Sequence, residues 1–197
     1  MSINVCNNNS LSAITSIPDS ITGSALNLIS TQTASSSTAI SFTSGIDSTY
    51  KEYIFKFFNI HPSGTNRFQF NGSSDSGSNY NVTKSTTVFI AGHNEGGSDT
   101  TLTYQSGDDH AQSTAFQDLM AYGNQDADDD HCLNGILHLF NPSDTTFVKH
   151  FISRSQGNID TNYSVNSYVG GYFNTTSAID AIQFKMTSGT FDGVIKL

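Results

Sequence analysis

The sequence predicts an all-β protein: a two-sheet antiparallel β-sandwich of jelly-roll-like form, preceded by an irregular N-terminal arm. Three observations lead to this prediction. The 197 residues include 14 Phe and 8 Tyr, which favour strands, whereas the residues that build long helices are sparse. Apolar and polar residues alternate over many short segments, which is the period of a strand with one buried face. Turn signals separate these segments at intervals of roughly 8 to 15 residues, as in sandwiches.

About ten strands are expected from this alternation. They are residues 37–43, 53–60, 67–70, 82–93, 101–104, 133–140, 147–153 and 167–173, with two more near the C-terminus. We expect 67–70 to return as the hairpin partner of 53–60. We also expect 147–153 to pair antiparallel with 133–140 across the turn at Asn141 and Pro142. Polar loops are expected at 71–81 and 156–162, and a helical turn is allowed only within 111–120.

The C-terminal stretch, residues 179–197, is expected to complete the core. Ile182, Phe184 and Met186 alternate with polar residues and so predict a strand with one buried face. A turn at 188–190 and a second strand at 193–197 follow. We interpret the pair as a hairpin that closes the sandwich.

The chain divides into residues 1–29, an N-terminal arm, and residues 30–197, the sandwich domain. The arm is low in charge, is interrupted by Pro18, and carries scattered aliphatic residues. One interpretation is a loosely ordered lead-in. The other is a segment that becomes ordered against a neighbouring subunit, because a free tail does not need so many aliphatic side chains. The candidate docking residues are Ile3, Val5, Leu11, Ile14 and Ile17.

Charge and composition exclude several classes of partner. The formal net charge is −9 with only 8 Lys and Arg, which argues against binding nucleic acid or an anionic membrane. No run approaches the roughly 18 apolar residues that a membrane helix needs, and the N-terminus lacks the pattern of a secretory signal. We therefore expect synthesis in a cytoplasm. Cys6 and Cys132 are expected to be free thiols.

No recognisable catalytic motif is present, and we expect neither enzyme activity nor a cofactor. The densest acidic cluster contains Asp126, Asp128 and Asp130. Such oxygens are Ca²⁺ ligands, but the glycine and distal glutamate of a calmodulin-type loop are missing, which favours a solvated loop. A smaller cluster at 108–110 is interpreted in the same way. His138 and His150 fall on neighbouring predicted strands and are interpreted as a structural pair.

Tyrosines recur in the polar loops beside Asn, Asp and Gly. Sugar-binding surfaces combine aromatic faces with such hydrogen-bonding groups, and tyrosines that close the ends of a sandwich give the same pattern. The candidate glycan-binding residues are Tyr80, Tyr104, Tyr122 and Tyr163, with Tyr168 nearby in sequence.

Several motifs occur together in a shared order. They are the segments 44–53 (SGIDSTYKEY), 75–80 (DSGSNY), 139–142 (LFNP) with 149–151 (KHF), 171–174 (GYFN), and the closing 182–197. In this order they resemble a family of small structural proteins of the virions of marine tailed bacteriophages, over about residues 28–197. Family members continue past the last strand with a short aromatic tail, whereas this sequence stops at Leu197.

The resemblance implies a protein assembled into a virion in the cytoplasm of the host bacterium, as a capsid decoration, head fibre or tail-associated component. We expect attachment through the N-terminal arm, other virion proteins as partners, and a homo-oligomer, with a trimer as the working expectation. The alternative is a receptor-binding, lectin-like module that recognises host surface glycan. The resemblance implies no catalytic residues.

Overall fold

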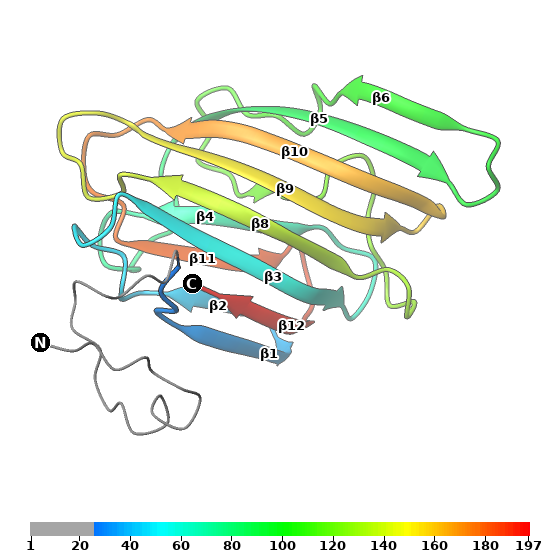
Figure 1. Cartoon of the computed structure of the whole chain (residues 1–197), viewed down its shortest axis with the longest axis horizontal. Coiled ribbons are helices and arrows are strands. Elements are labelled where there is room, and N and C mark those ends of the chain that lie inside the picture. Colours follow the sequence, from blue (N-terminus) through cyan, green and yellow to red (C-terminus); the bar gives the residue numbers. More distant parts are fainter. Residues whose placement is uncertain (1–25) are drawn as a thin grey trace, which may run out of the picture.

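The computed structural model describes residues 26–197, which form two antiparallel sheets packed face to face (Figure 1). This arrangement confirms the predicted β-sandwich, and the described residues contain no helix. The arm residues Ile3, Val5, Leu11, Ile14 and Ile17 lie outside the described range.

The large sheet has eight strands in the order β1-β12-β3-β8-β9-β10-β5-β6, and the small sheet has four in the order β2-β11-β4-β7. The strands of the large sheet are β1 (Thr31–Ser37), β3 (Glu52–Pro62), β5 (Lys84–Asn94), β6 (Thr100–Tyr104), β8 (Leu133–Phe140), β9 (Lys149–Ile159), β10 (Tyr163–Phe173) and β12 (Phe191–Lys196). Those of the small sheet are β2 (Ala39–Phe42), β4 (Phe68–Ser73), β7 (Gln117–Asp118) and β11 (Ala181–Met186). The chain changes sheet at most of its connections, as in jelly-roll-like sandwiches.

The core lies between the sheets and is built largely of phenylalanine. Phe184 of β11 lies at its centre, with its ring centroid 5.3 Å from that of Phe55 and 5.1 Å from that of Phe57, both on β3. Phe68 and Phe70 of β4 stack beside it at 5.8 and 6.3 Å. These edge-to-face and offset contacts add to the free energy of burying the rings, so the aromatic residues take the place of a larger aliphatic core.

The alternation predicted which face of each strand is buried. The side chains of Ile182, Phe184 and Met186 on β11 are buried, as are Phe55 and Phe57 on β3. β3 lies inside the large sheet between β12 and β8, and β8 pairs antiparallel with β9 as predicted.

Two predicted hairpins are wrong. β3 and β4 belong to different sheets, because β4 pairs with β11 and β7. β11 and β12 are likewise separated: β11 pairs with β2 and β4, and β12 with β1 and β3. The turn between β11 and β12 is held by the Asn66 side chain, whose Oδ1 accepts hydrogen bonds from the Ser188 backbone N–H and the Thr187 hydroxyl, each at 3.0 Å. Met186 and Phe191 thus enter the core from opposite sheets.

Two further local predictions are wrong. Residues 111–120 contain no helical turn but the two-residue strand β7. Backbone groups of this segment form hydrogen bonds with neighbouring strands, which leaves them unavailable for a helical turn. Lys84 and Ser113, for example, exchange two backbone hydrogen bonds of 2.9 Å. The predicted loop at 156–162 is shorter, because β9 continues to Ile159 opposite the start of β10.

Candidate functional site

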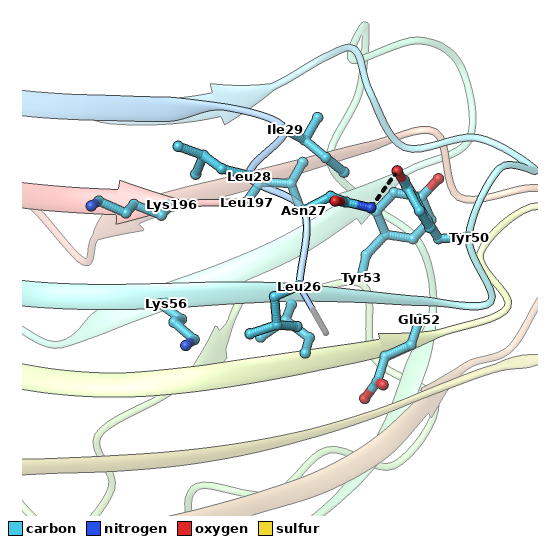
Figure 2. A pocket seen from close by; sticks show the side chains of 11 residues that line it. Leu26, Asn27, Leu28, Ile29, Tyr50, Glu52, Tyr53, Lys56, Lys196 and Leu197 are labelled. Atoms are coloured by element: carbon cyan, nitrogen blue, oxygen red, sulfur yellow. Dashed lines mark hydrogen bonds between the residues drawn. The ribbon is translucent and has the colours of Figure 1, made fainter. Parts of the chain in front are cut away.

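A pocket lies where the described chain begins and ends, and we call it the junction pocket (Figure 2). Its volume is about 310 Å³. The lining comes from the lead-in to β1, from the start of β3 and from the end of β12: Leu26, Asn27, Leu28, Ile29, Tyr50, Glu52, Tyr53, Ile54, Lys56, Lys196 and Leu197.

Backbone hydrogen bonds fasten the lead-in to the C-terminus. The N–H groups of Ile29 and Ser30 both donate to the carbonyl of Leu197, at 2.8 and 3.0 Å, and the Leu197 N–H donates back to Ser30. Ile29 also packs against Gly45, where a Cβ would lie 2.7 Å from its Cγ2 and where φ is +82°. A glycine is required there on both counts. The chain therefore enters the sandwich at a fixed position beside its own end.

Two tyrosines form one wall of the junction pocket. Tyr50 accepts a hydrogen bond of 3.1 Å from the Asn27 side chain, and its ring meets that of Tyr53 edge-on at 5.8 Å. The buried Tyr53 hydroxyl accepts the Asp47 backbone N–H at 3.0 Å, and its proton is shared between the Asp47 carboxylate at 2.9 Å and the Asp47 carbonyl at 3.0 Å. Burial raises the pKa of Tyr53, so this hydroxyl stays protonated and keeps the loop before β3 in place.

The opposite side of the pocket is cationic, and its rim is apolar. Figure 2 shows Lys56 and Lys196 on the side away from the tyrosines. Leu28 is 68% exposed at the rim, although large aliphatic side chains usually avoid water. This combination of aliphatic, aromatic and lysine side chains suits contact with another polypeptide.

The structure brings together only two of the four candidate glycan-binding tyrosines. Tyr122, in the loop after β7, meets Tyr163 at the start of β10 with ring centroids 5.8 Å apart. The Tyr163 hydroxyl donates to Asp99, which raises the pKa of Tyr163 to about 12.

The other candidates lie elsewhere. Tyr80 precedes β5 at the end opposite Tyr163, since Tyr163 is paired with Asn94 at the far end of β5, about 34 Å away along the strand. The Tyr80 hydroxyl is buried and has no hydrogen-bond partner among residues 26–197. Tyr104 is half-exposed on β6 and donates to Asp109, and Tyr168 lies in the middle of β10. The four tyrosines therefore do not share one surface.

The carboxylates of the candidate Ca²⁺ loop are engaged within the loop. Asp126 Oδ1 lies 2.5 Å from His131 Nδ1 and accepts the backbone N–H of Asp128. Burial disfavours the charged imidazole, but the hydrogen bond and charge of Asp126 outweigh it and raise the pKa of His131. Across residues 26–197, no three His, Cys, Asp or Glu side chains gather as a metal site would require.

The residues of the second acidic cluster, 108–110, contact different parts of the fold. Asp108 forms an ion pair of 2.5 Å with Arg67, while His110 Nε2 lies 3.0 Å from the carbonyl of Phe116. Cys132 forms no disulfide within residues 26–197, and Cys6 lies outside this range.

Sequence reasoning missed that two lysines, Lys84 and Lys149, are fully buried among residues 26–197. Lys84 is fully buried, and its ammonium donates to Asn71 Oδ1 at 2.9 Å and to the carbonyl of Ala115. Desolvation lowers the pKa of Lys84 to about 7. The alternation along β5 could have predicted this burial, because Lys84 has the same parity as the inward-facing Thr86, Val88 and Ile90.

Comparisons with protein families, with curated proteins and with solved structures found no match to this chain. In the part of the chain that the structure describes, no helix has the length and apolar character needed to cross a bilayer. The junction pocket thus combines two tyrosines, two lysines and exposed aliphatic side chains where the described chain begins and ends.

Proposed function

We propose that this chain is a structural component of a bacteriophage virion, displayed on the particle surface and attached through its N-terminal arm. The observation that carries the proposal is the junction pocket. The arm leaves the sandwich beside β1, an edge strand of the large sheet, where backbone hydrogen bonds to Leu197 hold the exit point. A segment attached at an edge strand can bind a neighbouring protein without disturbing the pairing of strands in either sheet.

The surface chemistry supports the same proposal. The motifs that resemble those of virion proteins extend from residue 44 to residue 197, and the acidic composition favours dispersion in water. At the junction, the exposed Leu28 and the two lysines supply apolar area and positive charge for other virion proteins. A homo-oligomer, with a trimer as the working expectation, would place several arms on one particle site.

Particle incorporation tests the proposal. A chain lacking residues 1–21 should unfold at the same urea concentration as the full chain and should fail to join particles in a complementation assay. Leu28→Glu should reduce incorporation as well. Leu102→Glu is the matched control, because Leu102 is 77% exposed on β6 and does not line the junction pocket. Full incorporation of the truncated chain would refute attachment through the arm.

Receptor binding remains the second candidate, because Tyr122 and Tyr163 do meet at one end of the sandwich. It predicts that Tyr122→Ala removes binding on an array of host glycans while particle incorporation is unchanged. Identical array profiles for both proteins would count against this site.

A further inference from the structure

The outer face of the large sheet carries a row of aromatic side chains that lies outside the core. Strand register places Tyr104, Phe89, Tyr168 and Arg154 side by side on β6, β5, β10 and β9. The rings of Phe89 and Tyr168 are parallel within 4°, with centroids 4.7 Å apart, and the guanidinium carbon of Arg154 lies 5.3 Å from the Tyr168 centroid. We call Phe89, Tyr168 and Arg154 the aromatic ridge.

A groove runs across the strands beside this ridge. The next row in register is Thr87, Gly170, Ile152 and His138, and the hollow over it has a volume of about 430 Å³. A second hollow of about 290 Å³ continues past Gly170. We call this combined surface the outer groove. Gly170 lies in its floor, and the aromatic ridge forms one wall.

The far wall of the outer groove is also aromatic. His150 and Tyr172 are paired across β9 and β10, and their ring centroids lie 5.7 Å apart. His138 and His150 therefore share this face, each with its own partner, since His138 Nδ1 lies 2.6 Å from Glu52. The walls of the outer groove thus combine apolar surface with hydrogen-bonding groups.

Gly170 is not explained by the fold. At the adjacent Gly171, a Cβ would lie 2.5 Å from the carbonyl oxygen of Ser85, so packing requires glycine there. At Gly170, the nearest atom to a Cβ would be Thr87 Oγ1 at an ordinary 3.6 Å, and φ is not in the left-handed region. A glycine inside a strand weakens it and often marks a close approach by a ligand. Because Gly170 has no side chain, the groove above it stays open.

Charge indicates what the outer groove binds. Arg154 donates through Nε to the neutral Asn166 at 2.8 Å, and it has no ion pair among residues 26–197. The same cross-strand row continues through Ile136 to Lys56 and Lys196. Three of the eight cationic residues of a chain with net charge −9 thus follow one line on this face. From Tyr168 to Lys196 the line spans about 19 Å, which suits a ligand with several negative charges.

We propose that the outer groove binds an acidic oligosaccharide, with apolar faces of the sugar rings against Ile152 and the aromatic ridge and with carboxylate or sulfate groups toward Arg154 and Lys56. A second copy of this chain is a poorer occupant, because a two-fold contact would bring the two cationic lines together. The inference goes beyond the proposed function, and the site is distinct from the Tyr122–Tyr163 pair.

Calorimetric titration of the full chain tests the proposal. The probes are hexasaccharides of galacturonate, guluronate and sulfated galactose, with maltohexaose and cellohexaose as uncharged controls. At least one acidic probe should bind more tightly than both controls and should weaken as salt is added. Arg154→Gln should reduce that affinity about tenfold or more. Gly170→Val, which fills the outer groove, should abolish binding. Lys185→Gln is the matched charge control, since Lys185 lies on β11 in the other sheet, over the Phe116 ring.

Three outcomes would overturn the proposal. The first is the absence of binding to every acidic probe, and the second is equal affinity for charged and uncharged probes with no effect of Arg154→Gln. The third is a dimer, seen by light scattering, that Gly170→Val dissociates, since a second copy would then occupy the outer groove. If Gly170→Val is misfolded by near-ultraviolet circular dichroism, Gly170→Ala takes its place. Its smaller side chain should weaken binding, and unchanged affinity would contradict the assignment.

Discussion

Both faces of the large sheet carry aromatic side chains, but those of the inner face are buried in the core and those of the outer face are partly exposed. On the inner face, Phe55 and Phe57 are buried and meet Phe184 of the small sheet in edge-on contacts. On the outer face, Phe89 is 43% exposed and stacks parallel to Tyr168 of the same sheet, with ring centroids 4.7 Å apart. Inner aromatic residues stabilise the fold through burial, whereas outer ones add little to stability. The difference separates the residues that fold the chain from those available for binding.

Removing the central ring of the inner face should give the largest effect. Phe184→Ala leaves a cavity among Phe55, Phe57, Phe68 and Phe70, and phenylalanine-to-alanine changes in cores cost about 3–5 kcal/mol. Urea unfolding followed by tyrosine fluorescence measures the change. A loss below about 1 kcal/mol, as expected for an exposed site, would contradict the assignment of this ring to the core.

The buried lysine should make stability depend on pH. The pKa of Lys84 is lowered from 10.5 to about 7, so between these values the unfolded chain binds more protons than the folded one. The free energy of unfolding should therefore rise with pH, by about 3 kcal/mol between about pH 6.5 and 9.5 from this group alone. The rise should be smaller by about this amount in Lys84→Met, when both proteins are unfolded in urea at each pH, and burial of Lys149, which also lowers its pKa, should supply a remaining rise of the same sign. Parallel pH profiles for the two would show that Lys84 is not the source.

Substitution of the two consecutive glycines of β10, Gly170 and Gly171, should show a clear difference in stability between the two faces. Gly171→Ala forces a methyl group against the Ser85 carbonyl and should cost about 1–3 kcal/mol. Gly170→Ala faces the outer groove and should change stability by about 0.5 kcal/mol or less. Thermal unfolding of the two variants measures the contrast. Equal losses would mean that both positions are constrained by packing.

The aromatic ridge should give the smallest effect on stability. Tyr168→Ala removes one stacked pair and one cation–π contact on the surface, worth about 1 kcal/mol or less together. The urea midpoint should barely move, while binding of the acidic hexasaccharide should be lost. A large loss of stability with binding retained would reverse the roles assigned to the two faces.

The sequence could predict which side of a strand is buried, but it could not predict partners. The alternation of Ile182, Phe184 and Met186 marks a buried face in either sheet. The Ser188-Gly189 turn matches a hairpin equally well, and only the distant Asn66 shows that the chain crosses between sheets. Pairing depends on contacts far apart in sequence, which local patterns do not encode.

The sites were harder to predict for the same reason. Gly170 and Gly171 are adjacent and identical in sequence, and only the atoms around each one distinguish a packing requirement from an open groove. Arg154, Lys56 and Lys196 look like isolated surface cations until strand register aligns them. The loop tyrosines, by contrast, were visible in the sequence, but their spacing could not show that the fold separates them.

The most direct test of the division between the faces is a map of backbone amide chemical shifts during titration with the acidic hexasaccharide that binds best. We expect changes centred on Thr87, Ile152, Arg154 and Gly170, with the amides of buried residues of the small sheet, such as Ile182 and Phe184 on β11, unaffected. Changes centred on Tyr122 and Tyr163, or on Asn27 and Leu28 in the lead-in to β1, would contradict the assignment of the outer groove as the binding surface.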